Sequence, residues 1–225
     1  YAQYYDLLYQ EKDYHSESDY VISLIKKFQK ETQNILEFGS GSGIHGRLLG
    51  NKGFKVSGIE KSQDMIDLGR LSLTSNEQGE NFSCTQGDCT NTFIGDDFDA
   101  IISLFHVLSY QTTNETVNEM LKNANRQLKQ GGIFVLDYWY APAVWNICPS
   151  LRVKRVNDEE VAITRIAEPE CLKEQNKIKV HYQTFVEDLK TKNISKIEET
   201  HVMRAFEKEE IKEFCNETGF ILLHS

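Results

Sequence analysis

The sequence predicts an α/β fold with a doubly wound, mostly parallel sheet. Short apolar runs alternate with amphipathic stretches from residue 34 to residue 138. The first apolar run leads directly into a glycine-rich segment, EFGSGSG at 37–43. Strands that alternate with helices are joined by right-handed crossovers, which produce a parallel sheet with helices on both faces. A glycine-rich turn after the first strand is typical of the Rossmann-like form of this architecture.

Five apolar runs are the candidate strands of this sheet. Four stretches with an apolar residue at every third or fourth position are the candidate helices. The strands are expected at 34–38, 55–59, 81–86, 98–104 and 132–138. The helices are expected at about 16–31, 44–52, 62–73 and 114–129. Because a helix follows each of the first strands, neighbouring strands are expected to run parallel.

The pattern changes after Pro142, where helical spacing gives way to alternation. In 178–186 every second residue, from Ile178 to Val186, belongs to one strand face. This period of two predicts antiparallel strands with one covered face over about 151–205. The pattern therefore predicts an inserted antiparallel β cap, which we expect to lie over the carboxyl edge of the parallel sheet.

A last helix at about 207–218 ends at Gly219, a residue suited to a helix C-terminus. A strand is expected to open at 220–223. Because Tyr1 is not a methionine, terminal residues are expected to be lacking from this sequence, and the open strand at 220–223 predicts further residues beyond Ser225. The expected division is a core of residues 1–137 and 206–225 and a cap of residues 138–205.

Composition narrows the classes of partner. The net charge of −9 disfavours contact with a phosphate backbone, so a nucleic-acid substrate is not expected. No apolar run reaches the roughly 18 residues of a membrane span, and the start lacks a signal-peptide pattern. The five cysteines are scattered without a CxxC pair. They argue against a disulfide framework and a metal site, and they suit a cytoplasmic protein.

The glycine-rich segment carries the strongest functional signal. Gly39, Gly41 and Gly43 stand at alternate positions directly after the first predicted strand. Glycine permits a positive φ and lets a ligand approach the backbone without a Cβ in the way. The helix that follows directs its N-terminal N–H groups toward the same place, which suits a carboxylate or a phosphate. The segment therefore predicts a cofactor-binding loop.

The same segment leaves two cofactor classes open. Residues 41–46 (GSGIHG) also spell G-x-G-x-x-G, the dinucleotide fingerprint, and Glu60 follows at the end of the second strand. An acid in that position can bind the ribose hydroxyls of a nicotinamide dinucleotide or of S-adenosylmethionine. A nicotinamide-dependent oxidoreductase is therefore the alternative, although the chain lacks an obvious Tyr-x-x-x-Lys pair or a comparable hydride-transfer group.

Taken in order, five segments make the chain resemble class I S-adenosylmethionine-dependent methyltransferases. They are ILEFGSGSG, VSGIEKSQDMI, QGD, FDAIISLFHVLSY and LKQGGIFVLDY. More narrowly, the opening YYDLLYQEKDYHSESDYV, the loop residues GIH at 43–45 and DYWY at 137–140 are similar to bacterial sugar-nucleotide N,N-dimethyltransferases. Those enzymes modify TDP-linked amino sugars. Two features depart from that group: His106 replaces a residue that is often small, and the sequence stops after the first strand of the usual closing hairpin.

The resemblance implies which residues hold the methionine part of the cofactor. Glu37, Gly39 and Gly41 would surround it, and Tyr14 would approach its carboxylate.

The resemblance also implies which residues hold the nucleoside part. Glu60 would bind the ribose and Met65 would pack on the adenine, although Met65 suits core filling equally well. Asp88 and the backbone N–H of Cys89 would read the adenine edge. Phe105, at the carboxyl end of the fourth strand, is placed in the same binding set.

Tyr9 and His106 are the candidate catalytic residues. The sulfonium of the cofactor is already a good leaving group, so the protein mainly has to orient the acceptor. An amine acceptor must in addition give up a proton, which a tyrosine or histidine near the methyl group can receive. The open alternatives are that Tyr9 packs in an amphipathic segment and that His106 only orients another residue.

The resemblance thus implies an enzyme that transfers a methyl group from S-adenosylmethionine to a small-molecule acceptor. The amino group of a nucleotide-linked amino sugar is the first candidate. Another small amine or hydroxyl acceptor stays open, and so does a binding module without catalysis. No membrane partner is expected, and a homodimer is left open.

Overall fold

The computed structural model describes residues 4–71 and 81–225. Contacts divide the chain into two compact units. The core is Asp13–Tyr138 with Lys208–Ser225, and the cap is Trp139–Glu207 with the described part of Tyr1–Lys12. The opening residues therefore group with the cap, whereas the sequence analysis placed them in the core.

The core contains a five-stranded parallel sheet in the order β3-β2-β1-β4-β5. Its strands are β1 (Asn34–Phe38), β2 (Lys55–Glu60), β3 (Phe82–Gln86), β4 (Phe98–Ser103) and β5 (Leu128–Leu136). The strand order reverses between β1 and β4, and ligands of open α/β sheets bind outside the carboxyl ends of the strands at such a point. The predicted Rossmann-like fold is confirmed.

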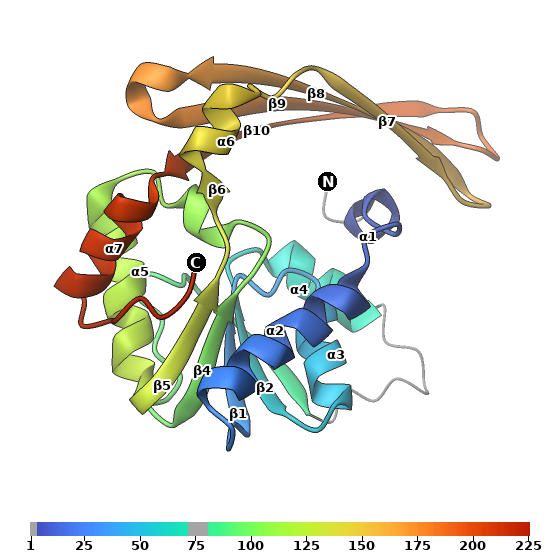
Figure 1. Cartoon of the computed structure of the whole chain (residues 1–225). Coiled ribbons are helices and arrows are strands. Elements are labelled where there is room, and N and C mark those ends of the chain that lie inside the picture. Colours follow the sequence, from blue (N-terminus) through green and yellow to red (C-terminus); the bar gives the residue numbers. More distant parts are fainter. Residues whose placement is uncertain (1–3, 72–80) are drawn as a thin grey trace. The chain divides into compact units, whose positions relative to one another are not determined.

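Helices cover both faces of this sheet (Figure 1). They are α2 (Tyr14–Phe28), α3 (Ile44–Asn51), α4 (Gln63–Leu71), α5 (Asn114–Gln127) and α7 (Lys208–Glu217). Figure 1 shows α5 and α7 on one side of the sheet and α2, α3 and α4 on the other. Asp13 starts α2 by accepting a hydrogen bond from the Ser16 N–H, and Thr113 starts α5 through a capping box with Thr116.

The alternation of side chains along β1 decides which residues meet which helices. Ile35 faces α2 and α3, where it joins Ile22, Leu49 and other buried residues in one apolar cluster. Phe38 points to the opposite face and meets the Phe134 ring at 6.0 Å. Glu37 shares the face of Ile35, so its carboxylate lies on the α2 and α3 side of the sheet.

The cap is a second five-stranded sheet in the order β6-β10-β9-β8-β7. Its strands are β6 (Trp139–Tyr140), β7 (Arg152–Asn157), β8 (Val161–Leu172), β9 (Lys177–Asp188) and β10 (Ile194–Phe206). β7 to β10 pair antiparallel, as the alternating pattern predicted, and β6 pairs parallel with β10. How the cap lies relative to the parallel sheet stays a prediction.

Two short helices cover one face of the cap sheet. The helix α6 (Ala141–Asn146) packs on Ile178, Val180 and Met203. The helix α1 (Tyr5–Leu8) packs on the other end of the same face, where Leu8 is fully buried against Val156, Ile163 and Val186. Burial of Leu8 in this cluster is the physical reason that the opening residues belong to the cap.

Two expectations are wrong. Residues 220–225 form no strand: Phe220 contacts Phe134, but Ile221 and Leu223 are exposed. Cys148 and Cys171 are joined by a disulfide in the cap, although the cysteine spacing argued against one. None of the helices in the described ranges is long and apolar enough to cross a membrane.

Asp99 ties three strands together at the amino edge of the parallel sheet. Its carboxylate accepts hydrogen bonds from the N–H groups of Gln33 and Asn34, both at 2.9 Å, and from Lys129 Nζ at 2.7 Å. Burial by itself would raise the pKa of Asp99, but these hydrogen bonds outweigh it and lower the pKa below its usual value. The carboxylate therefore stabilises the folded state wherever it is ionised.

We expect Asp99→Asn to lower the free energy of unfolding at pH 7 by about 2 kcal/mol, because hydrogen bonds to a charged acceptor are lost. The pKa of Asp99 is lower in the folded than in the unfolded chain, so this stabilisation is present above the unfolded value. It disappears as the pH falls through the folded value. Urea titrations between pH 3 and pH 7 should show the two proteins converging in acid. Asp96→Asn, at an exposed position of the preceding turn, is the control. Equal losses in both variants would contradict the prediction.

Candidate active site

The glycine loop between β1 and α3 has the conformation that its sequence demands. Gly39, Gly41 and Gly43 have φ values of +68°, +58° and +81°. Gly43 stands directly before α3, so the N-terminus of that helix opens at the loop. The N–H groups of Gly39 and Ser40 both donate to the Ile59 carbonyl of β2, at 2.8 and 3.2 Å. The loop is thereby fastened to the carboxyl end of the neighbouring strand.

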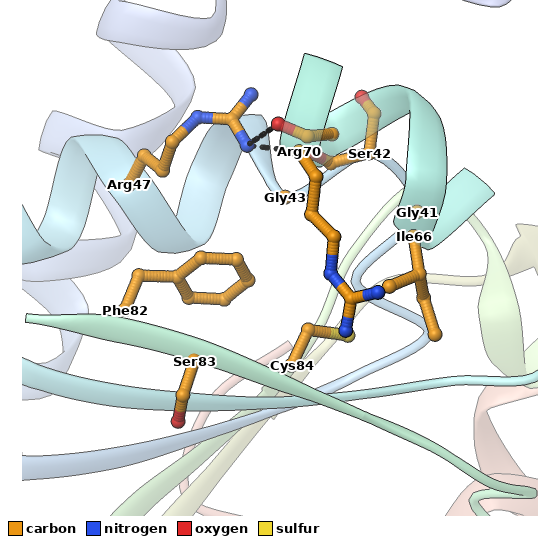
Figure 2. A pocket seen from close by; sticks show the side chains of 10 residues that line it. Gly41, Ser42, Gly43, Arg47, Ile66, Arg70, Phe82, Ser83 and Cys84 are labelled. Atoms are coloured by element: carbon orange, nitrogen blue, oxygen red, sulfur yellow. Dashed lines mark hydrogen bonds between the residues drawn. The ribbon is translucent and has the colours of Figure 1, made fainter. Parts of the chain in front are cut away.

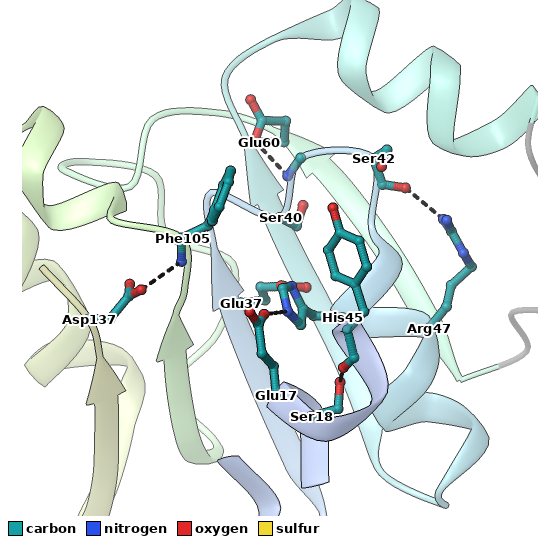
Figure 3. Close-up of polar contacts among 12 residues, drawn as sticks. Glu17, Ser18, Glu37, Ser40, Ser42, His45, Arg47, Glu60, Phe105 and Asp137 are labelled. Atoms are coloured by element: carbon teal, nitrogen blue, oxygen red, sulfur yellow. Dashed lines mark hydrogen bonds and ion pairs between the residues drawn. The ribbon is translucent and has the colours of Figure 1, made fainter. Parts of the chain in front are cut away.

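Glu60 joins the loop after β1 to the turn after β2. Its carboxylate accepts hydrogen bonds from the Gly41 N–H at 2.8 Å and from the Ser62 N–H at 2.9 Å. Figure 3 shows the bond from Glu60 to the loop. A carboxylate has about four lone-pair sites, so two hydroxyl groups can still donate to it. Glu60 therefore lies beside the loop, as predicted, and retains the capacity to bind a ribose.

Asp88 follows β3 and organises its own turn. It accepts hydrogen bonds from the N–H and hydroxyl of Thr90, at 2.9 and 2.8 Å, and from Lys61 Nζ at 3.0 Å. Partial burial acts to raise the pKa of Asp88, but the bonds from Thr90 and Lys61 lower it overall. Asp88 is thus ionised at neutral pH. Burial raises the pKa of the neighbouring Cys89 thiol to about 12, so this thiol stays protonated and unreactive.

A histidine that the sequence analysis did not single out lies beneath the loop. His45, in the first turn of α3, is 7% exposed, and its Nε2 lies 2.9 Å from Glu17 Oε2. Its Nδ1 lies 4.0 Å from Glu37 Oε1 (Figure 3), and the Tyr14 ring packs edge-on against the His45 ring, with the ring centres 5.0 Å apart. Glu37 is only 2% exposed, and a buried carboxylate requires compensation by a partner. His45 thus connects two predicted site residues, Tyr14 and Glu37.

The carboxyl end of β4 has an unusual backbone. Phe105 and His106 are not glycines, yet their φ values are +66° and +65°. Their N–H groups donate to the two oxygens of Asp137, at 3.2 and 2.8 Å. Figure 3 shows the bond from Phe105. Asp137 follows β5, and the sequence analysis assigned it no role. Its position after a strand at the carboxyl edge was the available signal.

The remaining predicted residues lie in different units. Met65 borders the glycine loop, since a Cβ on Gly41 would come 3.5 Å from Met65 Cε. Tyr9, in contrast, belongs to the cap, where its hydroxyl accepts a hydrogen bond from Arg165 Nη1 at 3.1 Å. Ten of the residues predicted from the sequence therefore lie in the core unit. They are Tyr14, Glu37, Gly39, Gly41, Glu60, Met65, Asp88, Cys89, Phe105 and His106.

A cavity of about 290 Å³ lies on the helix side of the loop (Figure 2). Its walls include Gly43, Ile66 and Phe82, and Figure 2 shows the side chains of Arg47 and Arg70 around it. Arg47 donates to the Ser42 carbonyl at 2.6 Å and so braces the loop. Gly41 of the predicted cofactor site also lines this cavity, whereas Glu60, Asp88 and Phe105 do not. The described residues contain no group of three metal-ligating side chains.

The residues present fit S-adenosylmethionine. The place of a Cβ on Gly41 has only Met65 Cε within 4 Å among the described residues, which leaves room for a ligand above the loop. Tyr14 and the Glu37 carboxylate offer polar groups for the amino-acid end, and Glu60 and Asp88 offer carboxylates for the ribose and the adenine amino group. When bound, the cofactor supplies an electrophilic methyl group on a sulfonium.

Comparison with known proteins identifies the class of enzyme. Residues 35–132 match a family model described as a methyltransferase domain. The chain is 24% identical over 221 residues to dTDP-3-amino-3,6-dideoxy-alpha-D-glucopyranose N,N-dimethyltransferase of Streptomyces fradiae. That match covers 97% of this chain and 82% of the relative.

Two solved structures share the fold. DesVI of Streptomyces venezuelae gives a TM-score of 0.81 at 23% identity, over 96% of this chain and 88% of DesVI. The sugar N-methyltransferase KedS8 from Streptoalloteichus sp ATCC 53650 gives 0.82 at 19% identity, over 96% of this chain and 83% of KedS8. These likenesses extend through both the core and the cap.

The chain is therefore a methyltransferase, and S-adenosylmethionine is its methyl donor, as predicted. The family match spans β1, the glycine loop, Glu60 and Asp88. The nicotinamide-dependent alternative is set aside, because the G-x-G-x-x-G at 41–46 lies inside the methyltransferase match. Which atom of the cofactor each site residue contacts stays a prediction.

We expect Gly41→Ala to raise the Kd for S-adenosylhomocysteine about tenfold or more, because the added methyl group enters the space above the loop. Gly53→Ala is the matched control. It also adds a Cβ at a positive φ, +95°, but with nothing within 4 Å and outside the site. Both variants should lose about 1–2 kcal/mol of stability from backbone strain. Calorimetric titration distinguishes them, and an equal loss of affinity in both would contradict the assignment of the loop.

Proposed function

We propose that the methyl acceptor is the amino group of a nucleotide-linked amino sugar and that the cap binds its nucleotide part. One observation carries this proposal: an arginine lies between two tyrosine rings on the covered face of the cap sheet. The guanidinium carbon of Arg165 is 5.2 Å from the Tyr9 ring centre and 5.3 Å from the Tyr182 ring centre. Cation and aromatic surfaces are thus presented together.

The strand register places this group between the two helices of the cap. Arg165 pairs with Thr184, and Tyr182 pairs with Ala167, in the rows between Ile163 and Val180. α1 covers the Ile163 end and α6 covers the Val180 end. The arginine and its tyrosines therefore occupy the middle of the covered face.

Two further contacts keep the group in place. Tyr182 packs edge-on against the His201 ring at 5.1 Å, and His201 Nε2 lies 3.1 Å from Glu199 Oε2. Burial raises the pKa of Tyr182, so its hydroxyl stays protonated and can donate a hydrogen bond. The ammonium of Lys154 lies 6.0 Å from the Tyr9 ring centre and adds a second cation.

This chemistry suits a nucleoside diphosphate. A guanidinium donates several N–H groups in a plane, which matches phosphate oxygens, and tyrosine rings stack on a base or a sugar face. The chain as a whole carries a net charge of −9, so a dianionic acceptor needs a local cluster of cations. The relative from Streptomyces fradiae is named for a dTDP-linked amino sugar, which supports the same class of acceptor.

The chemistry asks for two contributions from the chain. The acceptor nitrogen has to be held in line with the methyl group in a site from which water is excluded, and the proton that the nitrogen loses has to be received. We assign the first task to the cap group of Tyr9, Arg165 and Tyr182. The predicted catalytic role of Tyr9 is thereby refined: its hydroxyl accepts from Arg165 and can donate its own proton to the acceptor.

The proposal is tested with labelled S-adenosylmethionine and a panel of acceptors. The panel contains TDP-amino sugars, free amino acids, glycine and phenols. Transfer to an amino sugar, and none to its hydroxyl analogue, is the expected result. Transfer to glycine or a phenol without transfer to any amino sugar would overturn the acceptor and leave the methyltransferase class intact.

We expect Arg165→Ala to raise the KM for the nucleotide-linked acceptor about tenfold or more, because a charge-assisted contact to phosphate is lost. The Kd for S-adenosylhomocysteine should not change. Arg155→Ala removes the same charge from the same sheet, but Arg155 is exposed and faces the opposite side. Steady-state kinetics with both variants checks the prediction. If KM rises similarly in Arg165→Ala and Arg155→Ala, the rise is due to the change in net charge, and the prediction is contradicted.

A further inference from the structure

Asp137 is held more firmly than a residue at the end of an edge strand requires. Its backbone N–H donates to the Ser103 carbonyl at 3.2 Å, which fixes the residue to β4. Its two carboxylate oxygens each accept one hydrogen bond, from the N–H groups of Phe105 and His106. The Asp137 side chain is nevertheless 43% exposed, so these hydrogen bonds are not needed to compensate for the burial of its charge.

The backbone conformation of Phe105 and His106, which Asp137 holds, is energetically unfavourable. Non-glycine residues in the left-handed region are uncommon, because their Cβ comes too close to the backbone carbonyl oxygen. Here two consecutive side-chain-bearing residues adopt this conformation. Strained backbone of this kind persists where the surrounding structure enforces it, and it gathers at functional sites. The two hydrogen bonds from Phe105 and His106 to Asp137 enforce this conformation.

The result of this conformation is a fixed pair of rings. The rings of Phe105 and His106 stack at 5.9 Å with an interplanar angle of 25°. His106 Nδ1 comes to lie 3.4 Å from Asp137 Oδ2. A carboxylate beside Nδ1 favours the form of the ring that carries its hydrogen on Nδ1. The lone pair of that form is on Nε2, at the other end of the ring.

We propose that His106 receives the proton released by the acceptor amine and that Asp137 is its positioning residue. Asp137 holds the ring in place through the backbone and stabilises the imidazolium that forms. The inference rests on the proposed function, because the proton in question is the N–H proton of the acceptor amine. It extends that function by assigning the proton acceptor and the group that acts through it.

The proton balance is simple. Each methylation of an amine leaves the nitrogen with one N–H proton too many for a neutral product. That N–H bond breaks, its electron pair stays on the nitrogen, and the lone pair of His106 Nε2 forms the new bond to hydrogen. The ring becomes an imidazolium beside the Asp137 carboxylate and returns the proton to water after product release. No oxidant or further reactant is needed.

The first experiment measures the His106 ring without cofactor or acceptor. The ring is titrated by NMR in protein labelled at histidine, and its signal is identified by its loss in His106→Gln. In Asp137→Asn, the titration midpoint of this ring should move to lower pH by about 0.5–1 unit, because the imidazolium loses its adjacent negative charge. Asp99→Asn is the control, since Asp99 also accepts hydrogen bonds from two consecutive backbone N–H groups but lies at the amino edge. Its His106 midpoint should stay where it is.

The second experiment measures turnover against pH. His106 must be neutral to accept a proton, so kcat falls in acid as the ring becomes charged. In Asp137→Asn the acidic limb should move to lower pH and the plateau should fall about tenfold, whereas His106→Gln should cost about 10²-fold. In the His106→Gln background, Asp137→Asn should cost little more, because the two act as one unit.

The outcomes separate this inference from the proposed function. An unchanged His106 midpoint in Asp137→Asn, or full and additive losses in the double variant, would overturn the pairing even if amino sugars are methylated. A shifted midpoint with an acceptor that is not an amine would support the pairing and overturn the proposed function. Where Asp137→Asn folds poorly in thermal denaturation, Asp137→Glu keeps the charge. It should leave the midpoint within about 0.3 units of the wild-type value if the charge is the cause.

Discussion

The hydrogen bonds that continue from the β1–β2 ladder into the glycine loop are the constraint on which the cofactor site depends. Gly39 and Ser40 donate to the Ile59 carbonyl, and Gly41 donates to the Glu60 carboxylate. Because the three loop glycines adopt positive φ values, the chain can turn under these bonds and begin α3 at Ile44. The parallel sheet thereby sets the position of the loop, and the loop sets the position of the helix N-terminus.

The core uses carboxylates as backbone anchors at both edges of its sheet. Asp99 at the amino edge joins the starts of strands, and its role is stability. Glu60, Asp88 and Asp137 each accept backbone N–H groups at the carboxyl edge. Ligands of open α/β sheets bind at this edge. Hydrogen bonds to an ionised acceptor are stronger than neutral ones, so a few such residues suffice to hold exposed turns. The acidic composition of the chain therefore has a structural use at the site.

Sequence reasoning predicted site residues where the signal is local. Glu60 and Asp88 directly follow strands, and the glycines of 39–43 have no good alternative to a tight ligand-binding turn. His45 and Asp137 were quoted only within the segments GIH and DYWY and were given no role, because their roles depend on distant partners. Glu17 lies 28 positions from His45, and His106 lies 31 positions from Asp137. The strand expected at 220–223 was inferred from apolar residues alone. A strand needs a pairing partner, and in the structure this segment makes none.

The sequence by itself determined the parallel sheet, the glycine loop and the class of enzyme, because periodicity and glycine content act within a few residues of one another. Only the tertiary structure decided that the opening residues join the cap, that Tyr9 meets Arg165 across 156 positions, and that Phe105 and His106 are held in a left-handed backbone. These features are stabilised by contacts between segments far apart in the chain, and local propensity does not predict them. The left-handed pair shows the reason most clearly: local preference opposes it, and the Asp137 carboxylate from another strand outweighs that preference.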